Sequence, residues 1–326
     1  MSMAPQTAQP PVPAARVGTT EPAAPITAEA EASARRARRK NRLVALAFLA
    51  PFLVAFLLFV VWPMIHGFYL SFTNQSLTGA GGSFIGGDNY AEAFSDPKMW
   101  GSIRNTVWFT LISTVPLVII AMAMALLVNT GLPGQWLWRL SFFMPFLLAS
   151  TVISQIWSWL LDPEIGLANE VLTTLGFEPI AWLQTPHLDL ISITVATVWW
   201  TVGFNFLLYL AALQNIPEVQ YEAAAVDGAS RWRQIWSITI PQLMPVTGVV
   251  FVLQILASLK LFDQAYQMLG GVSSDTSRPI VQYIFEAGFV GYEFGYAAAI
   301  SYVFFALILV VGIVQITISN RRKGQR

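Results

Sequence analysis

Cysteine is absent from the 326 residues, and histidine occurs only as His66 and His187. Without a thiol, the chain can form no disulfide, no thiolate metal site and no cysteine nucleophile. Two single histidines also exclude a histidine-rich catalytic metal cluster. We therefore predict that the chain has no catalytic residue and no metal site.

Charged residues are scarce as well, at 11% of the chain, whereas a typical soluble domain has about 25%. The formal net charge is +0, so no basic field could attract nucleic acid. No glycine-rich phosphate loop followed by Lys-Ser or Lys-Thr occurs, which excludes ATP hydrolysis by that route. The mean hydropathy of +0.58 indicates a membrane protein.

Long apolar runs are abundant instead. A membrane-spanning helix needs roughly 20 predominantly apolar residues. Six runs qualify: Leu43–Met64, Thr106–Val128, Leu140–Leu161, Leu190–Leu213, Leu243–Phe262 and Tyr296–Ile318. Five of them contain no charged residue, and the fifth in order contains only Lys260, near its end. The sequence predicts an all-α integral membrane protein with six transmembrane helices in one domain over residues 43–320.

Basic residues predict the orientation, because positively charged loops stay in the cytoplasm. Residues 1–42 contain seven of them, and residues 321–326 contain four. The connections after the second and fourth spans contain three more: Arg139, Arg231 and Arg233. The opposite side contains only Lys98, Arg104 and Arg278. We predict a multi-pass protein of the plasma membrane with both termini cytoplasmic, a disordered tail over 1–42 and a basic tail over 321–326.

A polar stretch, Tyr221–Pro241 (YEAAAVDGASRWRQIWSITIP), interrupts the apolar runs. The Pro-Glu pair at 217–218 suits a helix start, the Asp-Gly pair at 227–228 predicts a turn, and Ser230 can cap a second helix. The second helix is amphipathic, with Trp and Ile recurring on one face. We predict a cytoplasmic helix–turn–helix on the inner membrane face, ending where Pro241 marks the entry to the fifth span. A plain amphipathic connector would fit the same spacing.

The same stretch resembles the EAA loop of ABC importer permeases, which combines Glu-Ala-Ala, a later glycine and a final Ile-x-Leu-Pro. The matching residues lie within 217–241: Glu222, Ala223, Ala224, Gly228 and Ile238-Thr239-Ile240-Pro241, with Ile240 in place of the usual Leu. Stretches such as GGDNYAEAF, SFFMPFLLAS and WSWLLDPEIGLANEVL are similar to carbohydrate-importer permeases of the maltose and glycerol-3-phosphate type. The resemblance extends over residues 43–320.

This resemblance implies the permease fold of binding-protein-dependent ABC importers and several partners. Two copies of a cytoplasmic ATPase subunit bind ATP and Mg²⁺, so this chain has no cofactor of its own. A second homologous permease subunit completes the path, an extracellular solute-binding protein delivers the substrate, and membrane lipid surrounds the spans. The implied ATPase-coupling residues are Glu222, Ala223, Ala224, Asp227, Gly228 and Pro241.

Polar and aromatic residues recur every three or four positions on the fourth and fifth predicted spans. Polar residues in spans normally face the bundle interior. There they either join helices, at about 0.6 kcal/mol per contact, or line a path for a neutral polyol. The resemblance implies substrate contacts midway along these spans, and the candidates are Trp200, Thr201, Phe204, Asn205, Gln254, Ser258 and Phe262.

These features predict the permease subunit of an ABC importer that moves a sugar or related polyol into the cell. Lys260 leaves an alternative open, because it either pairs with Asp263 or attracts an anionic substrate such as a glycerol phosphoester. An ion-coupled secondary transporter would need carboxylates at mid-membrane, and the predicted spans contain none. A membrane-embedded enzyme would need a nucleophile–base pair or grouped metal ligands. The sequence does not specify which sugar is carried.

Overall fold

The computed structural model describes residues 28–79, 81–131, 133–271 and 274–323. By its contacts the chain divides into two compact units, Met1–Pro63 and Met64–Arg326. Every regular element in the described residues is a helix, and Thr73 and Phe84 form one isolated antiparallel bridge. The prediction of an all-α protein is confirmed for this part of the chain.

The first unit contains α1 (Ala28–Phe56) and the π-helical turn η1 (Leu57–Val61), and α2 (Trp62–Leu70) begins at its end. The structure differs here from the prediction of a disordered tail over 1–42, because residues 28–42 form the first turns of α1. Their Ala, Glu and Arg residues are strong helix formers, so helicity there does not depend on apolar burial. Residues 1–27 lie outside the described ranges.

Five helical stretches in the described residues are long and apolar enough to cross a membrane, and a bent pair makes a sixth if it counts as one span. The five are Val44–Leu70, Pro97–Asn129, Leu188–Leu213, Arg231–Ser258 and Phe294–Gln315. Their ends differ from the predicted bounds because caps, rather than hydropathy, set where a helix begins. Asp96, for example, accepts a hydrogen bond from the Lys98 backbone N–H at 2.8 Å and starts its helix well before the apolar run.

The third predicted span, Leu140–Leu161, is not one straight helix. It is divided into α5 (Gln135–Phe143), the 3₁₀ turn η2 (Met144–Leu147) and α6 (Ser150–Leu160), and it bends by 96°. Pro145 lacks a backbone N–H and cannot continue α5, so the prediction of a continuous helix is wrong here. The Leu148 carbonyl, which follows the break, accepts a hydrogen bond from Trp200 Nε1 at 3.2 Å.

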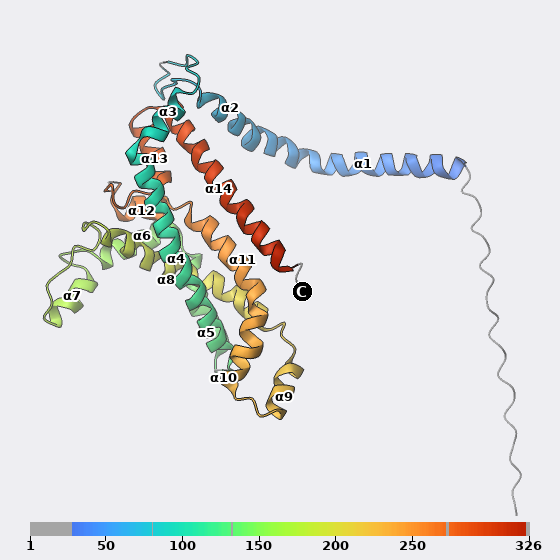
Figure 1. The fold of residues 1–326 in the computed structure, drawn as a ribbon, viewed down its shortest axis with the longest axis vertical. Helices are drawn as coiled ribbons and strands as arrows, with labels where there is room; N and C mark the ends of the chain where they lie inside the picture. Colours follow the sequence, from blue (N-terminus) through green and yellow to red (C-terminus); the bar gives the residue numbers. More distant parts are fainter. Residues whose placement is uncertain (1–27, 80, 132, 272–273, 324–326) are drawn as a thin grey trace, which may run out of the picture. The chain divides into compact units, whose positions relative to one another are not determined.

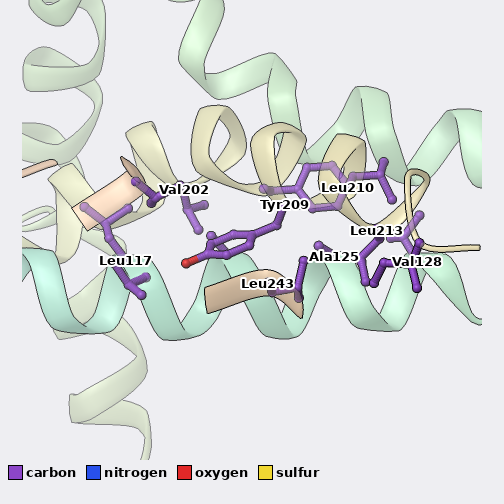
Figure 2. Packing of buried hydrophobic residues seen from close by; sticks show 13 residues of the cluster. Leu117, Ala125, Val128, Val202, Tyr209, Leu210, Leu213 and Leu243 are labelled. Atoms are coloured by element: carbon purple, nitrogen blue, oxygen red, sulfur yellow. The ribbon is translucent and has the colours of Figure 1, made fainter. Parts of the chain in front are cut away.

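The core of the second unit lies between α4 (Pro97–Asn129), α8 (Leu188–Leu213) and α11 (Ile240–Ser258). Figure 2 shows side chains of α4, such as Leu117, facing Tyr209 and its neighbours on α8, with Leu243 of α11 beside them. At Gly203 the α8 backbone approaches α5 so closely that an added Cβ would lie 2.1 Å from the Phe142 carbonyl oxygen. The three long helices therefore form a tightly packed frame.

Short helices complete the second unit. They are α3 (Asp88–Ser95), α7 (Leu167–Thr174), α9 (Glu218–Val226), α10 (Arg231–Gln234), the π turn η3 (Ile235–Thr239), α12 (Asp263–Met268), α13 (Ile280–Phe285) and the π turn η4 (Glu286–Val290), before the last helix α14 (Phe294–Lys323). In Figure 1, α3 and α13 lie near the start of α14, whereas α9 and α10 lie together at the start of the α11 stretch. Residues 321–323 of the predicted basic tail belong to α14, and 324–326 lie outside the described ranges.

Candidate functional site

The loop 217–241 contains the helix and turn that its sequence predicts. Pro217 is the N-cap of α9, which ends at Val226. Gly228 follows with a φ of +77°, in the left-handed region that favours glycine. The Ser230 hydroxyl then accepts a hydrogen bond from the Arg233 backbone N–H at 3.3 Å and caps α10.

The second helix of this loop is not a separate helix on the membrane face, which corrects the sequence-based expectation. α10, η3 and α11 form one continuous stretch from Arg231 to Ser258. The Ile240 N–H bonds to the Ile235 carbonyl, which makes a wider π turn directly before Pro241. Such a turn lets a helix continue past a local irregularity. Pro241 therefore lies in the first turn of α11, inside this continuous helical stretch.

Polar contacts hold α9 against the start of this long helix. The hydroxyls of Tyr221 and Thr239 lie 2.9 Å apart, and Gln242 Nε2 donates to Gln220 Oε1. Tyr221 also packs against the core that α4, α8 and α11 share, and Thr239 is only 3% exposed. The loop is thus fastened to the end of α8 and to the beginning of the α11 stretch.

Five of the six predicted coupling residues have exposed side chains or backbone, and Ala224 is half-buried. The exposed ones are Glu222, Ala223, Asp227, Gly228 and Pro241. Two apolar side chains near them are also open, with Val219 69% and Val226 89% exposed. This part of the loop offers a small, partly apolar surface that carries the acidic residues Glu222 and Asp227.

A cavity of about 380 Å³ lies between α8, α11 and the segment that follows α11. The seven predicted path residues and Lys260 all line it: Trp200, Thr201, Phe204, Asn205, Gln254, Ser258, Phe262 and Lys260. The sequence missed other lining residues, including Phe109, Phe146, Ser150, Asp263 and Gln264, whereas Thr197 belongs to the polar series on the fourth predicted span. The structure therefore brings together residues that the sequence places on two separate spans.

Lys260 and Phe262 lie beyond the helix in which the sequence placed them, because α11 ends at Ser258. The Lys260 side chain is exposed and lines the cavity. Its predicted pairing with Asp263 does not form, because no ion pair within 4.0 Å joins these two described residues. The cavity wall therefore carries a separate cation and a separate anion.

Amides and hydroxyls connect the helices around the cavity. Asn205 Nδ2 of α8 donates to Gln254 Oε1 of α11 at 3.1 Å. Gln254 Nε2 in turn donates to Ser258 Oγ at 3.2 Å, and Ser258 Oγ lies 3.1 Å from Ser113 Oγ of α4. These contacts join helices, and the same groups face a space that could hold a hydroxylated ligand.

Gln264 supplies a hydrogen-bond donor that the described residues do not use. Its Oε1 accepts a hydrogen bond from Thr197 Oγ1 at 2.7 Å, which fixes the amide orientation. Its Nε2 is buried without a partner, and the residue is 3% exposed. A buried unpaired donor costs about 1–3 kcal/mol. Gln264 lies six positions after Ser258, outside the predicted span, so helical spacing could not single it out.

Aromatic rings form much of the remaining wall. Phe146 of η2 stacks on Phe204 of α8 with ring centroids 5.2 Å apart and an interplanar angle of 25°. Among the described residues, no group of three or more His, Asp or Glu side chains could hold a metal ion. Amides, hydroxyls and rings around a space of this size suit a polar organic ligand.

Comparison with known proteins identifies a family. The family described as "Binding-protein-dependent transport system inner membrane component" matches residues 93–324. The sulfoquinovosyl glycerol transport system permease protein SmoG of Agrobacterium fabrum is 36% identical over 279 residues, covering 85% of this chain and 91% of that protein. The arabinooligosaccharides transport system permease protein AraP of Bacillus subtilis is 32% identical, covering 85% of this chain and 89% of that protein.

A third relative is the trehalose/maltose transport system permease protein MalF of Thermococcus litoralis, 32% identical and covering 84% of this chain and 93% of that protein. Among solved structures, a bacterial alginate ABC transporter in complex with an alginate pentasaccharide-bound periplasmic protein contains a similar chain. The TM-score is 0.75 at 23% identity, covering 86% of this chain and 96% of that one. This likeness shows that the two chains share a fold.

Proposed function

We propose a function from the premise that this chain belongs to the family of binding-protein-dependent transport system inner membrane components. The chain is the permease subunit of an ATP-driven importer for a sugar or related polyol. Membership confirms the family predicted from the EAA loop. The names of three relatives support the substrate class: they carry sulfoquinovosyl glycerol, arabinooligosaccharides and trehalose or maltose.

One observation carries this proposal: the seven path residues chosen from two spans line a single cavity of about 380 Å³. Amides such as Asn205 and Gln254 offer donors and acceptors for hydroxyl groups. Aromatic rings such as Trp200 and Phe204 offer flat apolar faces to the C–H surfaces of a sugar. A neutral polyol needs both kinds of contact.

The coupling loop 217–241 is the part through which we propose that the energy arrives. It joins α8 to α11, the two helices that contribute most of the predicted path residues. The Tyr221–Thr239 contact ties α9 to the start of the α11 stretch, so a force on α9 would move that stretch. The Asn205–Gln254 hydrogen bond links the same helices at the cavity. Movement at the loop would therefore change the cavity.

The proposed complex has three kinds of protein partner. Two copies of a cytoplasmic ATPase bind ATP and Mg²⁺ and grip the exposed face around Glu222. A second permease subunit supplies the other half of the path. A solute-binding protein docks on the outer loops, in line with the periplasmic protein in the alginate transporter structure. The bias of basic residues toward the termini and the loop 217–241 supports cytoplasmic termini.

The experiment is uptake of radiolabelled sugars into proteoliposomes that contain the whole complex. The panel should include sulfoquinovosyl glycerol, an arabinooligosaccharide, maltose and lactose, the sugars that relatives are named for. We expect uptake of one sugar class that requires both ATP and the binding protein. Uptake driven by an ion gradient without ATP would contradict the proposal.

A second candidate, import of an anionic polyol, is favoured by Lys260. This residue lines the cavity, and its ammonium group has no carboxylate within 4.0 Å among the described residues. Replacing Lys260 by Gln removes the charge but keeps a polar side chain. For an anionic substrate we expect uptake by the Lys260→Gln complex to fall about tenfold, a loss of about 1.4 kcal/mol, whereas Lys260→Arg retains most of it. A neutral substrate would pass equally well through both variants.

A further inference from the structure

Five aromatic side chains follow one another from the cavity toward the loop before α14. Phe262 lies 5.3 Å from Phe285 and 5.5 Å from Tyr266, measured between ring centroids. Phe285 stacks on Phe289 at 5.2 Å with an interplanar angle of 24°. Phe289 then meets Phe294 edge to face at 5.5 Å. The five rings form an unbroken series, which we call the aromatic track.

The two ends of the aromatic track lie in different surroundings. Phe262, at the inner end, lines the cavity that contains the predicted path residues. Phe289 and Phe294 form the outer end, where Phe289 is 51% exposed and is followed by the exposed residues Val290 and Tyr292 before α14 begins. The track therefore joins the cavity to a loop that the sequence predicts to be extracellular.

The rings of the aromatic track remain partly open, unlike the rings of the core. Phe109, Phe206 and Tyr209 are at most 1% exposed. Phe262, Tyr266, Phe285 and Phe294 are half-buried, and Phe289 is more exposed still. The accessible part of each ring leaves room for a ligand to stack.

Charged groups at both ends of the aromatic track argue against a lipid occupant. Asp263, beside Phe262, is exposed and lines the cavity. Glu293, beside Phe294, is exposed as well. An ionised carboxylate facing hydrocarbon is costly, so the track borders water at both ends. Open rings flanked by carboxylate acceptors suit a ligand with apolar C–H faces and hydroxyl donors.

We propose that the aromatic track is a binding surface for sugar rings, along which the substrate moves from the outer loop into the cavity. This inference rests on the proposed function, because it assumes that the cargo is a saccharide. The sugar stacks its C–H faces on successive rings and exchanges one ring for the next. The track thereby adds a binding surface outside the cavity itself.

The first test asks whether the outer end meets water in the assembled complex. The chain contains no cysteine, so in single Phe289→Cys and Val310→Cys variants any label on this chain reports the introduced residue. Both positions are open in the isolated chain, Phe289 at 51% and Val310 at 61%, but Val310 lies within an apolar span. We expect a membrane-impermeant maleimide to label Phe289→Cys and not Val310→Cys. No labelling of Phe289→Cys would mean that lipid or the second permease subunit covers the track, and would overturn the inference.

The second test measures uptake of the sugar that the wild-type complex transports. Phe289→Leu keeps apolar volume without a ring, whereas Phe289→Trp keeps a ring. We expect Phe289→Leu to lower uptake at limiting substrate about threefold to tenfold, and Phe289→Trp to retain it. Phe305→Leu, which replaces a 47% exposed ring outside the track, should leave uptake unchanged.

Each outcome of the uptake test bears on one proposal. Equal uptake by Phe289→Leu and the wild type would overturn the aromatic track, and so would equal losses in Phe289→Leu and Phe289→Trp, which indicate packing alone. A wild-type complex that takes up no sugar in the presence of ATP would instead overturn the proposed function. The two failures are therefore distinguishable.

Discussion

At the scale of single residues, the amide of Gln264 offers a direct test of ligand contact. Its Oε1 is held by Thr197 while its buried Nε2 has no partner among the described residues. Gln264→Glu keeps an acceptor toward Thr197 but replaces the donor by an oxygen. If the substrate accepts a hydrogen bond there, uptake by Gln264→Glu should fall at least tenfold, about 1.4 kcal/mol or more.

Thr197→Val is the matched control, because it removes the contact to Oε1 and leaves the Nε2 donor in place. Monodeoxy sugars, each of which lacks one hydroxyl, give a further test if the binding protein still binds them. The wild-type complex should transport poorly the sugar that lacks the hydroxyl contacted by Gln264 Nε2. The Gln264→Leu complex should transport that sugar and the parent sugar equally well. Equal uptake by Gln264→Glu and the wild type would show that the amide serves only to hold α12 to α8.

The turn glycine of the coupling loop gives a second prediction. Gly228 has a φ of +77°, and no atom lies within 4 Å of an added Cβ, so only backbone strain opposes a side chain. Gly228→Ala should destabilise the local turn by about 1–2 kcal/mol and reduce ATP-driven uptake. Gly248→Ala, on α11 with equally open space around it and no positive φ, should leave both uptake and the melting temperature of the purified complex close to wild type.

The sequence predicted the cavity residues on α8 and α11 because helical spacing aligns them and the family resemblance points to the same stretches. It missed Phe146 and Gln264. Phe146 reaches the cavity only because Pro145 breaks its span. Gln264 reaches it only because α11 ends at Ser258 and the chain turns back. These contacts depend on where the helices end, which a hydropathy profile does not show.

At the scale of elements, the contact between α9 and η3 should decide how force is transmitted. Tyr221→Phe removes the hydroxyl that meets Thr239 while keeping the ring packed on the core. We expect the complex to insert and to hydrolyse ATP, but to transport less sugar per ATP consumed. Parallel measurement of phosphate release and uptake gives this ratio.

The double variant Tyr221→Phe with Thr239→Val checks that the two hydroxyls act together. If they do, the double variant should be no worse than either single one. Losses that add up instead would contradict a direct link, and an unchanged ratio of sugar to ATP in Tyr221→Phe would show that force travels by another route.

Prolines illustrate why element bounds were only partly predictable. Pro145 ends a helix, as its missing N–H requires, although the sequence analysis placed it inside a continuous span. Pro241 and Pro245 lie within the first turns of α11, where a π turn precedes them. The same residue type therefore breaks one span and is tolerated in another, depending on how the preceding turn is wound.

At the scale of the whole molecule, the orientation in the membrane is the prediction that composition supports most directly. Thr78 lies in a predicted outer loop, and Thr130 follows α4 on the predicted inner side; both are exposed. In intact cells a membrane-impermeant maleimide should label Thr78→Cys, and it should label Thr130→Cys only after permeabilisation. The reverse pattern would invert the topology and place the loop 217–241 outside the cell.

The apolar runs were predictable because hydropathy and length define them, and the described residues contain five long apolar helical stretches, or six if the bent pair counts as one span. The 96° bend was not predictable, since a bent span and a straight one have the same composition. The partners could not be predicted from packing within a single chain. They are proposed from family membership instead.

Gly203 has one more consequence for how the cavity opens. There the α8 backbone touches the carbonyl of Phe142, with no side chain between them that could bend or change rotamer. Thr201 and Phe204, on either side of this point, both line the cavity. We expect any movement of α5 against α8 to pivot at Gly203, because the two backbones are in contact there. A Gly203→Ala substitution would place a methyl group against the Phe142 carbonyl oxygen, so α5 would have to move away from α8.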